Sequence, residues 1–306
     1  MKLRLIHMVG KLVRVQYGDV TVLEYHYQPD VPPEESPKPY IHPLATPQGD
    51  VLSLYRPHDH PWHHGLYFGW ASVNGVNLWG GASYVRGQGY VNRHDHGAMI
   101  HEGWDRLTVD KAGVWMEERI LWRDVEARPM ARERRTLVVY HPQNDNSLLV
   151  TLQAEVRAEP QQAPLRFSSP MIEGRPDPSG YSGLTLRLPR SMTGGEMFNS
   201  EGSTGDAVMG QRARWVCYTG GLDGSCKVCS VAIFDHPSNP RHPVHFFVRT
   251  VPYGVLNPAL CWDEVYVLEA SQALRLAYGV WVHVGRAEPA QVQGVYEQWL
   301  QSVKAQ

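Results

Sequence analysis

Short segments in which apolar and polar residues alternate follow one another along most of the chain. Residues 11–17 (KLVRVQY) and 20–27 (VTVLEYHY) alternate in this way on either side of Gly18-Asp19. A period of two places every second side chain on one face of a strand, and a Gly-Asp pair between two such segments is typical of a hairpin. Similar segments lie at 51–55, 66–70, 114–122, 134–141, 148–156, 184–188, 214–218, 228–234, 245–249, 265–269 and 274–283. The pattern predicts about a dozen strands or more.

The last segment of the chain has a helical period instead. Pro289 can occupy the first turn of a helix, and the apolar residues after it recur at intervals of three and four. These residues are Val292, Val295, Tyr296, Trp299, Leu300 and Val303. We therefore predict a helix at about 289–304 that packs on the outside of a sheet.

Strands that follow one another without intervening helices argue against a doubly wound or TIM-barrel fold. We predict an all-β fold, a large antiparallel β-sandwich with a C-terminal helix, as a single domain over residues 1–306. The proline-rich segment 29–43 is expected to be a stiff connector, and the glycine- and serine-rich segment 197–211 a loop.

Charge and composition argue against nucleic acid and membranes as binding partners. The 306 residues carry 29 Lys and Arg against 31 Asp and Glu, a formal charge of −2, so a nucleic-acid surface is not expected. No apolar run approaches the roughly 18 to 20 residues of a membrane span. The first 15 residues are interrupted by charges before a signal peptide could form, so we expect a cytoplasmic protein.

Aromatic usage favours a polar cleft. Ten Trp and 15 Tyr outnumber six Phe, so most aromatic rings carry a group that needs a hydrogen-bond partner. Carbohydrate sites have this composition, although large aromatics also fill β-sandwich cores. No nucleophile-elbow, P-loop or dinucleotide-binding motif opens a predicted helix, so the enzyme classes that use these motifs are not expected. Cys226 and Cys229 have no second cysteine pair beside them and lie in a predicted strand, so a zinc or redox site is not expected there.

Seven of the 15 histidines lie between positions 58 and 101, in two groups. The first group is in RPHDHPWHHGLYFGW, a proline-containing loop that leads into the predicted strand 66–70, and the second is in NRHDHGAMIHEGW. The members are His58, His60, His63 and His64, then His94, His96 and His101. Loops that lead into strands commonly present functional groups.

These imidazoles have three possible roles. They can act as general acids and bases near pH 7, which suits proton transfer to and from a sugar. They can bind a metal, and His94, His96 and Glu102 are similar to a cupin iron site. In the cupin motif, however, the Glu lies one or two residues closer to the second His, and a Gly precedes the motif, which this sequence lacks. Some, His58 and His94 above all, can simply bond to loop backbone.

The later half adds further polar segments. Residues 180–187 (GYSGLTLR) form a glycine turn into a strand that ends in Arg187, and residues 235–242 (DHPSNPRH) form a loop fixed by two prolines. The second segment is a candidate ligand site or, equally, a capped turn with Arg241 in a structural ion pair. Glu269 ends one predicted strand and His283 lies near the end of the next.

Several of these strings, in the same order, resemble the bacterial family labelled methane oxygenase PmoA. They are DHPWHHGLYFGW, GAMIHEGW, GYSGLTLR, DHPSNPRHP and YGVWVHVG. The family name refers to a subunit of a membrane-bound monooxygenase, and a chain without a membrane span cannot be that subunit.

The closing strands also look like the end of galactose mutarotase-like proteins. This resemblance implies a β-supersandwich in which a carboxylate takes a proton from a sugar hydroxyl and a histidine protonates the ring oxygen. By position it implies Glu269 as the base, with His63 or His64 binding the sugar.

The leading hypothesis is a carbohydrate-active protein that performs His and Glu acid–base chemistry on a sugar ring as an epimerase, lyase or hydrolase, without a cofactor. The predicted catalytic residues are His63, His64, Glu269 and His283. The predicted substrate-binding residues are Asp59, His60, His101, Arg187, His236, Asn239, Arg241 and Trp70, with Trp62 and Trp79 as further stacking faces. One alternative is a metal-dependent oxygenase or lyase that holds one divalent ion with His60, His63 and His64, and another is a non-catalytic sugar-binding sandwich.

Overall fold

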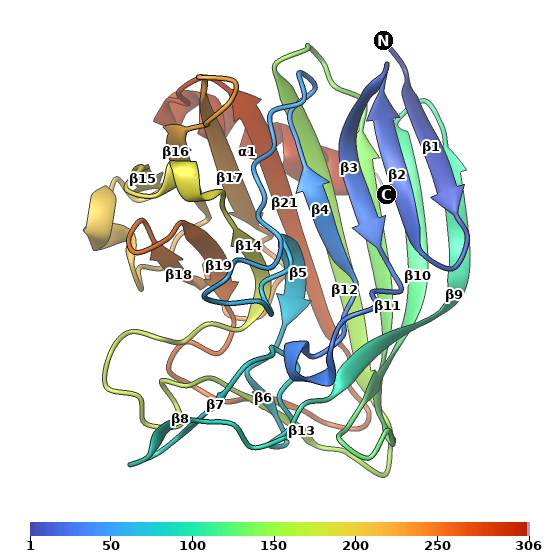
Figure 1. Ribbon diagram of the computed structural model, residues 1–306, viewed down its shortest axis with the longest axis vertical. Coiled ribbons are helices and arrows are strands. Elements are labelled where there is room, and N and C mark those ends of the chain that lie inside the picture. The colour runs from blue at the N-terminus through green and yellow to red at the C-terminus, as the bar shows by residue number, and fades with distance from the viewer. Residues whose placement is uncertain (305–306) are drawn as a thin grey trace.

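Two antiparallel sheets face each other in the computed structural model, which describes residues 1–304 (Figure 1). The first sheet has eight strands in the order β1 (Leu3–Met8), β2 (Leu12–Tyr17), β3 (Val20–His26), β4 (Tyr40–Leu44), β5 (Leu66–Gly69), β14 (Gly183–Arg187), β19 (Val255–Ala259) and β18 (His245–Arg249). The second also has eight, in the order β15 (Glu196–Asn199), β16 (Trp215–Gly221), β17 (Val228–Asp235), β21 (Leu274–Val284), β12 (Ser147–Ala158), β11 (Pro129–Tyr140), β10 (Gly113–Arg123) and β9 (Ala98–Val109). This confirms the predicted all-β sandwich.

Smaller elements gather beside the two large sheets. A three-stranded sheet joins β20 (Tyr266–Leu268), β13 (Leu165–Ser168) and β6 (Ser72–Val73), and a hairpin joins β7 (Ser83–Val85) to β8 (Gly89–Val91). Short 3₁₀ turns lie at Pro33–Glu35, Arg190–Met192 and Gly205–Val208. In Figure 1 the labels of β6, β7, β8 and β13 lie together at the bottom of the view, among long loops.

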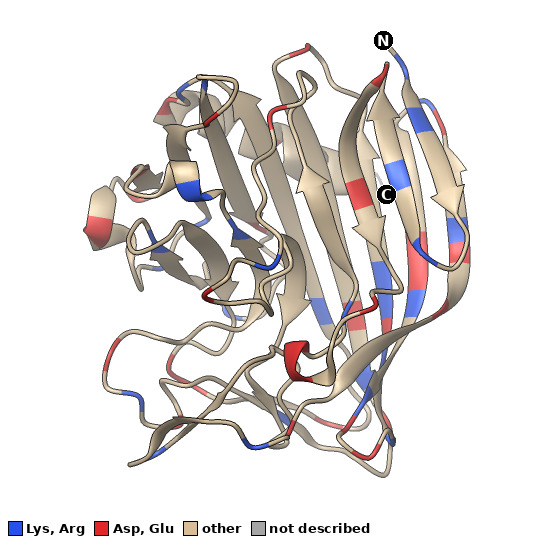
Figure 2. Ribbon diagram, viewed as in Figure 1, with Lys and Arg blue, Asp and Glu red and all other residues tan. Residues whose placement is uncertain are grey.

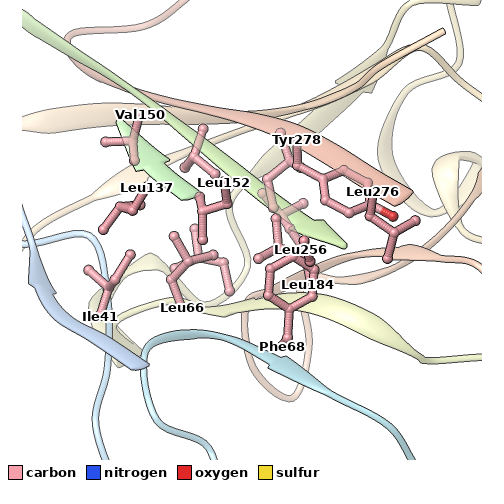
Figure 3. Packing of buried hydrophobic residues seen from close by; sticks show 14 of the residues in the cluster. Ile41, Leu66, Phe68, Leu137, Val150, Leu152, Leu184, Leu256, Leu276 and Tyr278 are labelled. Atoms are coloured by element: carbon pink, nitrogen blue, oxygen red, sulfur yellow. The ribbon is translucent and has the colours of Figure 1, made fainter. Parts of the chain in front are cut away.

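Alternation along the strands builds the core between the large sheets. Figure 3 shows Leu66 and Phe68 of β5 and Leu184 of β14 facing Leu152 and Tyr278 of the opposite sheet. Burial of these apolar side chains is the main stabilising contribution to the sandwich. Because the side-chain period is two, the intervening residues of the same strands lie on the other face of the first sheet.

The helix α1 (Pro289–Lys304) covers the outer face of the second sheet. Its Tyr296 and Trp299 pack with Trp215 and Trp281 of the sheet, and Trp299 Nε1 donates a 2.8 Å hydrogen bond to Thr151 Oγ1. The helix therefore forms where its apolar stripe predicts it and packs as expected.

Most of the predicted strands are present, but segment 51–55 forms only isolated bridges and segment 29–43 contains the start of β4. The sequence pattern also misses β9, which spans 12 residues. This strand is at the edge of its sheet and its register against β10 shifts at two places, so its side chains lose the regular alternation on which the prediction depends.

Charged residues form mixed rows rather than a patch of one sign on the strands at the right of Figure 2. Arg132 Nη1 lies 2.9 Å from Glu102 Oε2, and Arg106 Nη1 lies 3.6 Å from Glu117 Oε1. Exposed pairs of this kind contribute little to stability, about 0 to 1 kcal/mol each. Among the described residues, no helix has both the length and the apolar character needed to cross a membrane.

Candidate functional site

A cavity of about 360 Å³ lies over the face of the first sheet that is turned away from the core. Its walls are two imidazoles, several large aromatic rings and two arginines. The lining residues include His60, Trp62, His63, Trp79, Tyr90, Arg175, Tyr181, Phe247, Arg249 and Tyr253. Concave sites of this size with aromatic walls and a few polar groups are typical of small-molecule binding.

The strand pattern explains why polar groups collect under this cavity. Leu184 and Leu186 of β14 point into the core, so Thr185 and Arg187 point the other way. Phe247 and Arg249 of β18 lie on the same outer face and line the cavity. The sheet thus presents two arginines to a region that the loops 56–64, 70–90 and 170–181 cover.

The histidine loop is shaped by tight turns before β5. The backbone N–H of His60 donates to Pro57 O at 3.0 Å, and that of His63 donates to His60 O at 2.9 Å. The chain enters β5 through Gly65, which has a φ of 69°, and a Cβ there would lie 2.3 Å from Ile41 O. Only glycine satisfies both requirements, so Gly65 fixes how the loop leaves the sheet.

Asp59 connects this loop to Arg187 and to Arg190, which follows β14. Arg190 Nη2 donates to Asp59 Oδ1 at 2.6 Å, and Arg187 Nη2 lies 3.3 Å from Oδ2. His60 Nδ1 lies 3.1 Å from the same Oδ2, although it makes no well-aligned hydrogen bond there. Burial acts to raise the pKa of the Asp59 carboxyl, but the contact with His60 and the charge of Arg187 outweigh it and hold that pKa well below its ordinary value.

His60 and His63 form one side of the cavity, with ring centroids 4.9 Å apart. Burial lowers the pKa of His60, and the Asp59 charge partly opposes this effect. Burial, followed by the charges of His60 and Arg187, lowers the pKa of His63 well below its ordinary 6.5. Both rings are therefore neutral near pH 7, and among residues 1–304 neither nitrogen of His63 has a hydrogen-bond partner.

Trp62 and Trp79 supply broad aromatic faces. Trp62 packs on two glycines with positive φ, and a Cβ on Gly81 would lie 2.5 Å from its ring. Trp79 contacts Tyr181, with centroids 4.5 Å apart, and lies edge-on to His63 at 5.9 Å. Flat rings on two sides of a polar cavity suit a ligand that has both apolar faces and hydroxyl groups.

The far wall of the cavity is an ordered network of tyrosine and arginine. Arg175 binds Asp177 through two hydrogen bonds of 2.7 Å and also donates to Tyr90 Oη. Tyr90 Oη and Tyr181 Oη are 2.9 Å apart. Burial, followed by the nearby Tyr90, raises the pKa of Tyr181, so the Tyr181 phenol acts as a neutral hydrogen-bonding group.

His64, which we predicted as catalytic, has a structural position. Its Nε2 lies 2.8 Å from Glu35 Oε2, and Arg56 binds the other oxygen of that carboxylate at 2.7 Å. His64 has no exposed surface and does not line the cavity. Burial, then the charges of Lys38 and Arg56, lowers the pKa of His64 to about 2. The consecutive residues His63 and His64 therefore point to different environments.

The predicted residues that line the cavity are His60, Trp62, His63 and Trp79. Asp59 and Arg187 lie behind its wall, where they form an ion pair of 3.3 Å. Glu269 and His283 do not line the cavity. Glu269 is exposed in the loop after β20. His283 shares a face of β21 with Trp281, on which it stacks at 4.8 Å, and this face carries α1. Strand alternation thus turns His283 to the outside of the second sheet.

Two further predicted residues lie in the sandwich interior. Trp70 is buried against Phe167 and Trp122, with centroids 4.8 and 6.1 Å away, so it contributes to the core rather than to a stacking face. His101 Nδ1 lies 2.7 Å from Glu118 Oε1, and Glu118 also accepts a hydrogen bond from Tyr25. Burial raises the pKa of Glu118, and His101 opposes the rise.

The loop 235–242 is a capped turn, the second of the two predicted alternatives. Asn239 Nδ2 donates to Asp235 Oδ1 at 2.7 Å and to Ala277 O at 2.8 Å. Arg241 donates to the carbonyls of Leu260, Glu264 and Val265. His236 lies 2.7 Å from Ser238 Oγ and 5.6 Å from the Trp299 ring of α1. These side chains hold the loop and do not line the cavity.

The alternative metal site is not formed by the predicted histidines. His64 is turned toward Glu35 while His60 and His63 line the cavity. Over the described part of the chain, no group of three or more His, Cys, Asp or Glu side chains is placed to hold a metal ion.

The sequence analysis did not predict several residues that line the cavity, namely Tyr90, Arg175, Tyr181, Phe247, Arg249 and Tyr253. Arg175 and Tyr181 flank the segment PDPSG, and Arg249 and Tyr253 flank TVP. Proline next to polar side chains was a usable signal for these two segments, since two prolines among polar residues were the reason for selecting 235–242. Nothing in the local pattern distinguishes the loops at the cavity from the structural one.

Comparison with solved structures finds similar chains at low sequence identity and low TM-score. The alpha-galactosidase from Lactobacillus brevis is 7% identical, with a TM-score of 0.42 over 92% of this chain and 39% of its own. A variant of the GH36 alpha-galactosidase AgaA from Geobacillus stearothermophilus, in complex with raffinose, is 12% identical, with a TM-score of 0.38 over 93% of this chain and 41% of its own. A protein described as a kojibiose phosphorylase, from the human microbiome, is 9% identical, with a TM-score of 0.33 over 69% of this chain and 25% of its own. The chain thus spans about two fifths or less of the length of these carbohydrate-active enzymes.

Comparison of the sequence gives a family match but no relative of known function. The model described as "Family of unknown function (DUF6807)" matches residues 12–297. No curated protein matches the chain. The expected membership of the family labelled methane oxygenase PmoA is therefore wrong, since the family model that matches the chain is that of DUF6807.

Proposed function

The chain belongs to DUF6807, a family of unknown function, and we propose from its cavity that it binds a carbohydrate and performs acid–base chemistry on it. The observation that carries the proposal is the pair of neutral imidazoles, His60 and His63, 4.9 Å apart in one aromatic-walled cavity. Neutral imidazole can accept a proton at a free ring nitrogen and return it at another position of the same ligand.

His60 is the proposed base. Asp59 is 3.1 Å from its Nδ1, so the carboxylate favours the tautomer with a proton on that nitrogen and leaves Nε2 as the acceptor. When Nε2 takes a proton, the imidazolium that forms lies beside a negative charge that Arg187 and Arg190 hold in place. Contacts of this kind are often loose without a ligand and tighten when it binds.

We assign His63 as the residue that exchanges a proton with a second hydroxyl or with the ring oxygen of the sugar. It is buried, it lines the cavity, and its nitrogens are not used by other described residues. Trp62 and Trp79 would stack on the faces of the sugar, and Tyr90 and Tyr181 would bond its hydroxyls. These roles replace the earlier assignment to His64, Glu269 and His283.

The test is to incubate the protein with glucose, galactose, glucuronate and galacturonate in D₂O and follow each sugar by proton NMR. Interconversion of anomers, deuterium incorporation at a ring carbon and elimination each give a distinct change in the spectrum. We expect one of these changes with the wild type, and a rate reduced at least about 100-fold in His60→Ala and His63→Ala.

The matched control is His94→Ala, because His94 is exposed and outside the cavity. Conversion that persists in both cavity variants would overturn the proposal. Saturable binding that depends on His60 without conversion of any sugar would assign the cavity to a binding module and reject the catalytic step.

A further inference from the structure

The cavity is surrounded by more positive than negative charge. Arg175 and Arg249 line it, and Arg187 and Arg190 lie directly behind it at Asp59. These four arginines are opposed by the carboxylates of Asp59 and Asp177. Arg175 and Arg190 are committed to these two carboxylates through hydrogen bonds of 2.6 to 2.7 Å. The excess positive charge is therefore on Arg187 and Arg249.

Arg187 is a buried cation with unused donors. Its side chain has no exposed surface, and its guanidinium lies 3.5 Å from the centre of the Tyr253 ring, which lines the cavity. Nη2 reaches Asp59, but Nε and Nη1 have no hydrogen-bond partner in residues 1–304. Burying an unpaired N–H of a charged group is costly, so such donors normally meet an acceptor. The hydroxyl of the buried Tyr67, beside His63, also has no partner there.

Arg249 offers a second set of donors at the cavity wall. Its nearest carboxylate, on Asp177, is 3.8 Å away, beyond hydrogen-bond distance. The guanidinium lies over the Phe247 ring at 5.1 Å, which restrains its position without using its N–H groups. A planar guanidinium with free N–H groups is the side chain best suited to bind a carboxylate through two hydrogen bonds.

We propose that the ligand of this cavity is a sugar acid, whose carboxylate is bound by Arg249 with the buried Arg187 behind it. The inference rests on the proposed function, since it names the class of sugar that the same cavity takes. A carboxylate offers Arg249 two acceptor oxygens and a negative charge that balances the cation of Arg187 behind the wall, whereas the hydroxyl groups of a neutral sugar offer acceptors without the charge.

The experiment is calorimetric titration of the full chain with matched pairs, glucuronate against glucose and galacturonate against galactose, with glucose 6-phosphate as a third anion. We expect the dissociation constant of at least one acid to be about 10-fold or more below that of its neutral partner, because a charge-assisted hydrogen bond is lost with the carboxylate. Tighter binding of glucose 6-phosphate than of glucuronate would overturn the assignment to a carboxylate.

Variants locate the carboxylate. Arg249→Gln should reduce the preference for the acid to about 3-fold or less without changing thermal unfolding, since Arg249 is at the cavity wall. Arg187→Lys keeps the buried charge but removes the planar guanidinium with its several N–H donors, and should weaken binding of the sugar acid as well. Arg134→Gln, on an exposed arginine of β11, is the matched control and should bind like the wild type.

The outcomes separate this inference from the proposed function. Equal binding of acid and neutral sugar, lost in His60→Ala, would overturn the sugar-acid inference and leave the proposed function intact. Acid binding that is unchanged in both Arg249→Gln and Arg187→Lys would also overturn it, because the carboxylate would then lie elsewhere. Absence of binding by every member of both pairs would overturn the inference and the proposed function together.

Discussion

Nδ1 of His60 lies 3.1 Å from Oδ2 of Asp59, and that carboxylate is held by Arg187 and Arg190 from the other side. The imidazole is thus coupled to a negative charge that cannot move away. This coupling distinguishes His60 from a histidine that merely fills a wall of the cavity, and it leads to a prediction about its titration.

Replacing Asp59 with Asn should lower the pKa of His60 further, because the charge that favours the imidazolium is removed. Titration of the imidazole signals by NMR measures the change. Asp177→Asn is the matched control, since Asp177 is paired with Arg175 and does not touch His60. A His60 titration that is the same in Asp59→Asn and in the wild type would contradict the coupling.

His63 and His64 are adjacent in sequence but should respond differently to substitution. His64→Ala removes a hydrogen bond from the buried Glu35 carboxylate and should lower the free energy of unfolding by about 2 kcal/mol. His63→Leu removes no hydrogen bond between described residues, so it should cost about 1 kcal/mol or less while abolishing conversion of the sugar. Urea unfolding followed by tryptophan fluorescence measures both values, and the reverse order would show that His63 is the structural residue.

Trp62 should lose its position when Gly81 gains a side chain. A Cβ at Gly81 would lie 2.5 Å from the Trp62 ring, so Gly81→Ala must displace the ring and should weaken ligand binding about as much as Trp62→Ala. Gly202→Ala has similar backbone strain, with a φ of 84°, but its Cβ would meet no other atom within 4 Å. Titration with the same sugar should therefore show a loss in Gly81→Ala alone. An equal loss of affinity in Gly81→Ala and Gly202→Ala would show that backbone strain, and not displacement of Trp62, is the cause.

Stability should fall as the pH is lowered from 7 toward 5. Burial lowers the pKa of His42 to about 4, and it lowers the pKa values of His63 and His64 in the same direction. Between these folded values and the ordinary 6.5, the unfolded chain binds more protons, so protonation favours unfolding as the pH falls through 6.5. Each of the three histidines can contribute up to about 1.4 kcal/mol per pH unit.

Urea unfolding at pH 7, 6 and 5 measures this dependence. His42→Gln should reduce the slope, and His94→Asn, at an exposed histidine with a φ of 54°, is the matched control. The Asp59 carboxyl should add a separate loss only below about pH 4, because its folded pKa is depressed and its stabilisation disappears when it is protonated. A stability that is constant from pH 7 to pH 5 would contradict the burial of these neutral imidazoles.

Glu269→Gln and His283→Gln should leave ligand binding and conversion within about 2-fold of the wild type, since surface changes away from a site have small effects. Glu269 is exposed, and His283 lies on the side of the second sheet that carries α1. The NMR assay described above measures both. A large loss in Glu269→Gln would restore the carboxylate base implied by the mutarotase-like closing strands.

Most of the strands, the C-terminal helix and the group of histidines in the loop before β5 could be predicted from the sequence alone. Alternation with a period of two and the apolar stripe of 289–304 are local properties, and local properties can be read along a chain. The same alternation shows that Arg187 and Leu186 lie on opposite faces of a strand, and that His283 and Trp281 share one. Where both faces of a strand are buried, as in β14, it does not show which face is turned to the core.

Which of these faces lie next to one another depends on how distant segments pack in the folded protein. Arg187 reaches Asp59 across 128 positions of sequence because β14 pairs with β5, directly after the histidine loop. His283 does not reach the cavity because its face of β21 is covered by α1. The side chains of loop 235–242 do not reach it either, because they donate hydrogen bonds to backbone carbonyls such as those of Ala277 and Leu260. Strand order and the packing of the sheets depend on contacts between distant segments, and no local pattern encodes those contacts.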